Sequence, residues 1–273
     1  MCRVDDINSM QRIGRALRLF CRYQATNLSS GMEYRGAFLT QVFAMIVNNS
    51  AFIIFWLILF ERVGTIEGYD FSAVMFLWAI TAVGFGIAAV FFGNSTYLSR
   101  IIYNGELDVY LLQPKPVMLN VLMSRSQVSG WGDMTYGIIL FLATQPISVG
   151  SMLLFVLFSL LFSLVLVSLR VLYHSVTFFL GNAEELAARG SDMIISFALY
   201  PGTLFKGPVL MVLHSLIPAA FAAWIPYEIF SKFDLTKLAL VICFDILLAA
   251  AALGVFRLGL RFYESGNRMG VRL

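Results

Sequence analysis

Charged side chains are scarce in this chain, and their scarcity excludes an ordinary soluble fold. Only 13% of the residues are Asp, Glu, Lys or Arg, whereas a soluble domain usually carries about 25%. Four stretches contain none of them, namely residues 36–60, 71–99, 134–169 and 207–227. Since about 20 apolar residues in a helix span a bilayer, the sequence predicts an all-α integral membrane protein.

The sequence also lacks the motifs of enzymes and metal sites. It contains no GxxxxGK, HExxH, GxSxG or GxGxxG pattern, so we expect no ATP hydrolysis, no catalytic residue and no cofactor in this chain. Its three cysteines, Cys2, Cys21 and Cys243, are scattered and predict neither a disulfide framework nor a zinc site. Its two histidines, His174 and His214, have no second ligand at helical spacing and are expected to pack between helices or to lie at the membrane interface.

The apolar runs and their breaks predict six spanning helices. Pro146 and Gly150 divide the run 134–169 into a hairpin. The region 193–226 is too long for one span and too short for two, which predicts a broken or re-entrant fifth span. The predicted spans are 37–60, 71–93, a third that ends near residue 146, 151–179, 193–226 and 236–260, with a polar connector over 182–192 before the fifth.

The distribution of positive charge predicts the orientation. If both termini lie in the cytoplasm, all but four of the 19 Lys and Arg residues fall on the inner side. The four exceptions are Arg62, Lys206, Lys232 and Lys237. Cytoplasmic loops carry an excess of Lys and Arg, so six spans with both termini inside is the consistent arrangement. The membrane domain is then 37–260, between an N-terminal part (1–36) and a tail (261–273).

The N-terminal part contains an amphipathic helix. Between residues 13 and 23 apolar side chains recur at helical spacing and arginines occupy the other face. A basic amphipathic helix of this kind lies in the headgroup layer, where arginine reaches lipid phosphates. The alternative is a solvated cytoplasmic helix. We prefer the interfacial helix, with membrane lipid as its partner.

Five polar residues fall at membrane depth: Asn48, Asn49, Asp133, Arg170 and Asp245. Ionisable residues in spans are functional candidates by default, and amides there need partners in other helices or a cavity. One interpretation is an ion-coupled carrier in which Asp133 and Asp245 titrate. The other is that both carboxylates bond neighbouring helices. Carriers often contain inverted repeats, and this sequence contains no visible repeat.

The longest polar stretch between spans is 94–117, NSTYLSRIIYNGELDVYLLQPKPV. It contains Gly105-Glu106-Leu107-Asp108, then Leu111-Leu112 and Pro114-Lys115-Pro116. A short amphipathic helix that ends at prolines suits docking into a groove of a soluble partner. An ordinary loop is the alternative.

At this point the sequence resembles the permeases of ABC-2 type exporters, and more narrowly a six-span, viologen-exporter-like branch described as ABC-2 family transporter protein. Four stretches carry the resemblance. They are Tyr34-Arg35 before the first span, the G-x-L-D-x-x-L-L-x-P pattern from Gly105 to Pro114, Tyr200-Pro201 with Ile217-Pro218 and Pro226 in the fifth span, and Tyr263-Glu264-Ser265-Gly266-Asn267 in the tail.

The resemblance implies a permease subunit that exports an amphiphilic or bulky organic substrate across a bacterial inner membrane. It implies two protein partners, a separate ATPase that binds ATP and Mg and a second, identical or related permease, and no nucleic acid. It also implies that residues 94–117 form the segment that couples to the ATPase, through Gly105, Glu106, Leu107, Asp108, Leu111, Leu112 and Pro114. A membrane scaffold that transports nothing is the remaining alternative.

Overall fold

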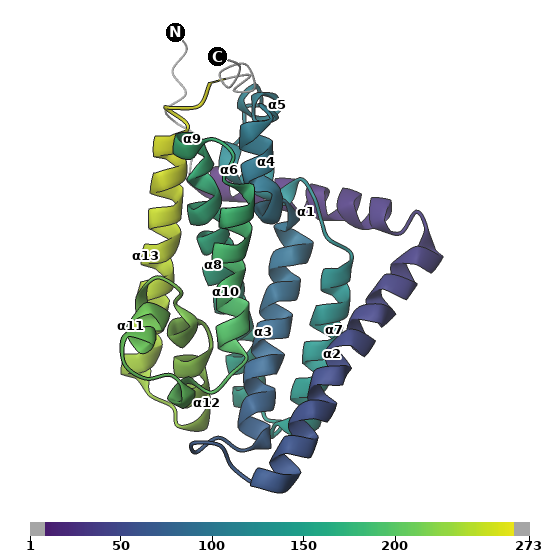
Figure 1. Cartoon of the computed structure of the whole chain (residues 1–273). Coiled ribbons are helices and arrows are strands. Elements are labelled where there is room, and N and C mark those ends of the chain that lie inside the picture. The colour runs from purple at the N-terminus through teal and green to yellow at the C-terminus, as the bar shows by residue number, and fades with distance from the viewer. Residues whose placement is uncertain (1–8, 265–273) are drawn as a thin grey trace.

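The computed structural model describes residues 9–264, which form an elongated bundle of helices with no β-sheet in that range (Figure 1). The α-helices are α1 (Ser9–Gly31), α2 (Arg35–Val63), α3 (Phe71–Phe91), α4 (Leu98–Tyr103), α5 (Asp108–Leu111), α6 (Val117–Met123), α7 (Ser129–Thr144), α8 (Val149–Ser175), α9 (Thr177–Leu180), α10 (Glu184–Ala198), α11 (Pro208–Ser215), α12 (Ile225–Ser231) and α13 (Leu235–Gly259). Two 3₁₀ turns, η1 (Gly93–Tyr97) and η2 (Gly202–Leu204), and one π-helical turn, η3 (Ala220–Trp224), join them.

The structure bears out the membrane class but not the number of spans. Among the described residues, α2, α3, the unit α8–α9 and α13 are each long and apolar enough to cross a membrane. The pair Pro208–Ser215 and Ala220–Ser231, bent by 70°, raises the number to five. The third predicted span is α7, whose 16 residues fall short of the ~20 that a perpendicular crossing needs. Six spans with cytoplasmic termini therefore stays a prediction.

The predicted polar connector over 182–192 is wrong, because most of it is helical. Helix α10 begins at Glu184 and continues to Ala198. Two acidic residues in its first turn complement the helix dipole, and Arg189 Nε donates to Glu185 Oε1 at 2.7 Å one turn earlier. Polar residues on the exposed face of a helix look like a loop when only apolar runs are counted. The region expected as one broken span is therefore α10 followed by α11, η3 and α12.

Helix α1 lies across one end of the bundle, roughly at right angles to the upright helices (Figure 1). We call this end, which carries α1, α4–α6 and residues 260–264, the α1 end. The ring of Phe20 packs against Phe91 and Phe92 at the end of α3, and Asn27 donates to the carbonyl of Met123 at 3.1 Å. Such a position across the helix ends is the one that an interfacial helix requires.

The centre of the bundle is the contact between α3 and α7, which approach each other at glycines. A Cβ atom added to Gly86 would lie 2.6 Å from the Gly130 carbonyl oxygen and 2.4 Å from Met134 Cγ. A Cβ atom added to Gly137 would lie 2.8 Å from the Ala79 carbonyl oxygen. Small residues at regular spacing allow such close backbone contact between helices in a membrane, where van der Waals packing replaces the hydrophobic effect.

We therefore predict that Gly86→Ala destabilises the protein, whereas Gly254→Ala does not. The added methyl group at Gly86 has no space and should cost about 1–3 kcal/mol. Gly254 is also helical but has no atom within 4 Å of an added Cβ, so its replacement should leave the stability unchanged or raise it by about 0.5–1 kcal/mol. Thermal unfolding in detergent measures both. Equal melting temperatures for the two variants would contradict the close packing of α3 on α7.

Candidate functional site

The segment 94–117, which we call the coupling segment, continues directly from α3. Turn η1 and helix α4 extend the helix beyond the bundle to Asn104. There the chain reverses at Gly105, whose φ is +78°. The Glu106 N–H donates to the Ile101 carbonyl at 3.0 Å and the Gly105 N–H donates to the Ile102 carbonyl at 3.2 Å. This pair of bonds is the Schellman motif, which favours glycine at its left-handed position, so Gly105 sets the direction of the next turn, α5.

Two of the residues assigned to ATPase coupling, Leu107 and Asp108, pack against the bundle. Leu107 is 0% exposed and packs in a small apolar core with Leu98, Phe178 and Phe256. Asp108 is half-buried and accepts a hydrogen bond of 3.0 Å from the Tyr263 hydroxyl. Burial raises the pKa of Tyr263 to about 12, and the hydrogen bond to Asp108 contributes to this rise. The hydroxyl is therefore a neutral donor at physiological pH. Leu107 and Asp108 therefore hold the coupling segment against the bundle.

Next to Leu107 and Asp108, the coupling segment has an exposed apolar tip. Val109 and Leu112 are 63% and 87% exposed, and Leu111 lies beside them at 43%. Glu106 and Pro114 are also exposed. The tip, defined as Val109, Leu111 and Leu112, stands farther from the bundle than α1 does, as the position of α5 shows (Figure 1). The sequence analysis missed Val109, although its spacing from Leu112 is one helical turn.

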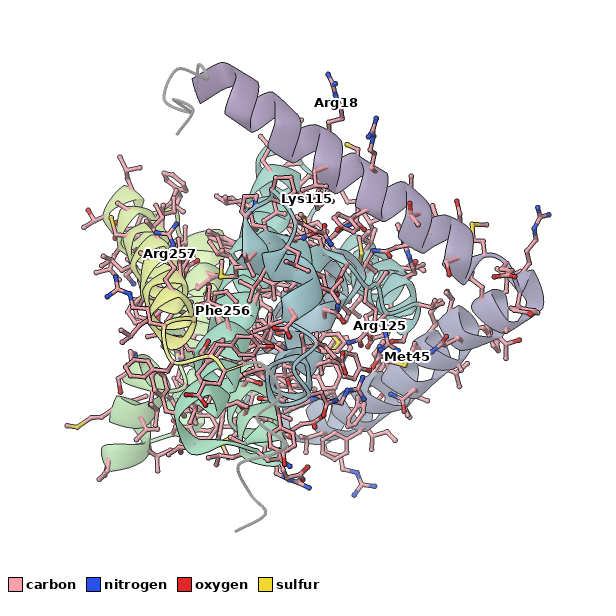
Figure 2. The ribbon with its side chains drawn as sticks, turned by 90° about the horizontal axis from the view of Figure 1, so that it is seen from above. Arg18, Met45, Lys115, Arg125, Phe256 and Arg257 are labelled. Carbon is pink, nitrogen blue, oxygen red and sulfur yellow. The ribbon has the colours of Figure 1, made fainter. Side chains whose placement is uncertain are left out.

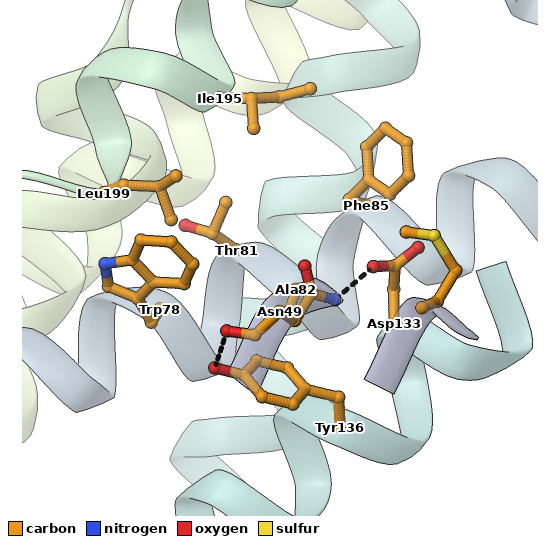
Figure 3. A pocket seen from close by; sticks show the side chains of 10 residues that line it. Asn49, Trp78, Thr81, Ala82, Phe85, Asp133, Tyr136, Ile195 and Leu199 are labelled. Atoms are coloured by element: carbon orange, nitrogen blue, oxygen red, sulfur yellow. Dashed lines mark hydrogen bonds between the residues drawn. The ribbon is translucent and has the colours of Figure 1, made fainter. Parts of the chain in front are cut away.

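A cavity of about 200 Å³ lies between α2, α3, α7 and α10 (Figure 3). Helix α3 contributes the largest share of its wall. The lining residues are Met45 and Asn49 on α2, Trp78, Thr81, Ala82 and Phe85 on α3, Asp133 and Tyr136 on α7, and Ile195 and Leu199 on α10. A mostly apolar wall with a few convergent polar groups is typical of small-molecule sites.

Asn49 joins two of the polar residues of this cavity. Its side-chain Nδ2 donates to Asp133 Oδ1 at 2.8 Å, and its backbone carbonyl oxygen accepts from the Tyr136 hydroxyl at 3.2 Å (Figure 3). The second oxygen of Asp133 is buried without a hydrogen-bond partner among the described residues, as are Thr81 Oγ1 and Trp78 Nε1. These three polar atoms are therefore buried among the residues that line the cavity.

The structure does not bring the other polar residues of the spans to this cavity. Asn48 lies on the exposed side of α2, next to Val47. Asp245 is 0% exposed on α13, and neither of its carboxylate oxygens has a partner among the described residues. Arg170 is buried on α8, where its Nη2 donates to Asp192 Oδ1 at 3.0 Å and its guanidinium carbon lies 5.4 Å from the Phe85 ring centre.

Two of these placements bear on the sequence analysis. Asp192 was assigned to the connector, so the ion pair that accounts for Arg170 was missed. His174 packs between helices as expected, because it is fully buried and the Ser99 N–H donates to its Nδ1 at 3.2 Å. This bond ties α8 to α4 at the base of the coupling segment.

Comparison with known families agrees with this geometry. A family model described as ABC-2 family transporter protein matches residues 46–267. The chain belongs to this family. The matched range contains the coupling segment, Tyr263 and nearly the whole cavity wall, and it excludes α1. The same comparisons found no significant match among curated proteins or solved structures.

Membership assigns the chain to membrane transport. Permeases of the ABC-2 family are typically non-catalytic subunits that work with an ATPase partner. The two family-like motifs at Gly105–Pro114 and at Tyr263 meet in this ABC-2 permease through the hydrogen bond between Tyr263 and Asp108. The rest of the tail motif, residues 265–267, lies outside the described residues.

We predict that Tyr263→Phe loosens the coupling segment. A hydrogen bond to a carboxylate contributes about 1.5–3 kcal/mol. Because this pair is partly exposed, its removal should lower the stability of the segment by about 1.4 kcal/mol, which is a tenfold change in the equilibrium for local opening. Amide hydrogen exchange of residues 104–112 should therefore become about tenfold faster. Tyr34→Phe is the matched control, because Tyr34 is 74% exposed and its hydroxyl group forms no hydrogen bond with the described part of the chain. Unchanged exchange in the Tyr263 variant would mean that the bond does not hold the segment.

Proposed function

We propose that the chain is the permease subunit of an ABC exporter, which moves an amphiphilic or bulky organic substrate outward while a separate ATPase hydrolyses ATP. The observation that carries the proposal is the exposed apolar tip on a segment continuous with α3. Three exposed apolar side chains at the end of a rigid projection are costly in water and suit a groove on a soluble partner. In this proposal the ATP and its Mg belong to the partner, and this permease supplies no catalytic residue.

The path for mechanical work follows the covalent and packing connections of the coupling segment. Its first end continues into α3, which carries Trp78, Thr81, Ala82 and Phe85 in the cavity wall. Its second end leads through α6 into α7, which carries Asp133 and Tyr136. Displacement of the tip by an ATPase would therefore move two walls of the cavity. Because α3 and α7 are in backbone contact, they would move as a pair against α2 and α10.

In the same proposal the α1 end faces the cytoplasm of a bacterial cell and the chain lies in the plasma membrane. The excess of Lys and Arg at this end agrees with the rule that cytoplasmic loops are positive. The tip then projects toward the compartment that contains ATP. The N-terminal helix α1 lies in the inner headgroup layer.

A second permease, identical or related, completes the transporter. Helix α2 is apolar and only Trp56 and Phe60 of its residues are buried, and Asn48 on its exposed side has no partner among the described residues. An amide in hydrocarbon is costly without a hydrogen bond, so this face is better suited to a protein partner than to lipid. We do not favour the ion-coupled carrier, because the cavity contains Asp133 but not Asp245. We do not favour the scaffold either, because a scaffold needs no cavity.

We predict that the double variant Val109→Ser with Leu112→Ser loses the ATPase. Burial of two such side chains contributes roughly 3 kcal/mol, so the affinity for the cognate ATPase should fall about 100-fold. Co-purification and substrate-stimulated ATP hydrolysis measure the loss.

Leu180→Ser with Leu186→Ser is the matched control for this docking experiment. These leucines are 71% and 64% exposed on α9 and α10. Their replacement therefore removes about as much exposed apolar surface as the tip variant does, but outside the tip. The docking proposal is wrong if the tip variant retains the ATPase, or if both double variants lose it equally.

We also predict that a photo-crosslinker at residue 48 captures a second permease. Asn48→benzoylphenylalanine should give an adduct with the mass of two permeases after illumination of membranes. Leu247→benzoylphenylalanine should give only lipid adducts, because Leu247 is 69% exposed at similar depth on α13, on the opposite side of the bundle from α2 (Figure 1). A protein adduct at 247 with none at 48 would place the partner elsewhere.

A further inference from the structure

Two arginines at the base of the coupling segment share one tyrosine ring. The guanidinium carbon of Arg100 lies 4.9 Å from the Tyr97 ring centre, and that of Arg125 lies 4.7 Å from it. The two cations are therefore no farther apart than the sum of these distances. Both side chains are exposed, and neither forms an ion pair or a hydrogen bond within the described chain. The two acids of the coupling segment form hydrogen bonds elsewhere, since Glu106 accepts from Asn104 and Asp108 accepts from Tyr263.

Rigid backbone holds both arginines in place. Arg100 belongs to α4, whose Leu98, Ile101 and Ile102 are buried in the small apolar core. The loop that carries Arg125 is bonded to the end of α3. There the Gln127 N–H donates to the Ala89 carbonyl at 2.9 Å, and Gln127 Nε2 donates to the Gly93 carbonyl at 3.2 Å. Two like charges held against one tyrosine ring, neither of them in an ion pair among the described residues, favour an anion, and guanidinium groups match the geometry of phosphate oxygens.

The depth of the pair identifies the source of the phosphate. Arg125 lies two residues before Gln127, which is bonded to the last turn of the membrane-spanning helix α3. Trp131 and Phe91 pack together at this level with ring centres 6.5 Å apart. Tryptophan marks the membrane–water interface. Helix α1 lies at the same level as α4, whereas α5 extends beyond it (Figure 1). In the view from this end, Arg125 lies in the angle between α1 and α2 (Figure 2).

We propose that Arg100 and Arg125, arranged around Tyr97, bind the phosphate of an anionic phospholipid headgroup. The lipid would bridge the two ends of the coupling segment, because Arg100 lies in its first part and Arg125 lies eight residues after its end. Its bound headgroup would thereby hold the base of the segment rigid. This consequence for coupling rests on the proposed function, whereas the lipid site itself does not.

The test measures binding of phosphatidylglycerol to the purified full chain by native mass spectrometry. Each arginine near an anionic headgroup gives roughly a fivefold preference, so Arg100→Gln with Arg125→Gln should weaken the tightest phosphatidylglycerol site about 30-fold. The control, Arg257→Gln with Arg261→Gln, removes the same charge from exposed positions at the same end and should change binding by less than about twofold. Arg125→Gln alone changes one exposed loop residue and should weaken phosphatidylglycerol binding about fivefold. This single variant replaces the double variant in the test if the double variant does not fold.

Three outcomes would overturn the proposal. Equal losses in the two double variants would mean general charge attraction. Binding of inorganic phosphate in phosphatidylcholine nanodiscs, abolished by loss of the same arginines, would mean a free phosphate ligand. Normal phosphatidylglycerol binding with loss of the ATPase would mean that the arginines contact the ATPase.

The consequence for coupling has a separate readout. In nanodiscs of phosphatidylcholine alone, the ATPase should bind but be stimulated less by substrate than in equal parts of phosphatidylcholine and phosphatidylglycerol. If no ATPase binds in either membrane while the arginine-dependent lipid site persists, the proposed function fails and the lipid site stands. If the ATPase binds and is stimulated equally in both, without an arginine-dependent lipid site, the lipid proposal fails and the function stands.

Discussion

The backbone contact between α3 and α7 is the constraint on which the rest of the structure depends. Gly86, Gly130 and Gly137 allow the backbones of the two helices to approach closely, and this contact brings the two ends of the coupling segment together. Because Gly93 packs against the Arg125 carbonyl with space for no Cβ atom, the same closeness extends beyond the bundle. The part of the cavity wall that α3 and α7 form is consequently packed in one unit with the base of the coupling segment.

Polar groups stabilise this unit where apolar packing ends. The Tyr23 hydroxyl donates to Asn120 Oδ1, Asn120 Nδ2 donates to Gln113 Oε1 at 3.1 Å, and Asn94 Nδ2 donates to Ser124 Oγ at 2.6 Å. These bonds join α1, α6 and the coupling segment. Helix α1 is therefore bonded to the base of the coupling segment rather than separate from it, and a displacement of α1 would reach the tip through a few short hydrogen bonds.

The sequence was sufficient for features that local patterns determine. Helix α3 begins at its predicted start and α13 begins one residue before its predicted start, because Asp70 and Asp234 cap them and apolar runs follow at once. It was insufficient where a residue depends on a distant partner. Nothing near Arg170 indicates Asp192, and nothing near Asp108 indicates Tyr263. Helix α10 was missed for a related reason, since its polar start is stabilised by its own ion pair and by burial of Ala187 and Ile194, which apolar run length does not detect.

The exposed side of α2 completes the physical argument for an assembly. Most residues of α3 are buried by neighbouring helices, whereas few residues of α2 are buried although the two helices are equally apolar. Lipid could cover the apolar side chains, but Asn48 would then lie in hydrocarbon without a hydrogen bond. Asn49, the next residue, shows how the same amide is accommodated when a partner helix is present, because it bonds Asp133 and borders the cavity. Since α2 is also a cavity wall, a second permease on its outer side would control how far α2 can move from α3. Contact between the permeases and opening of the cavity would then depend on the same helix.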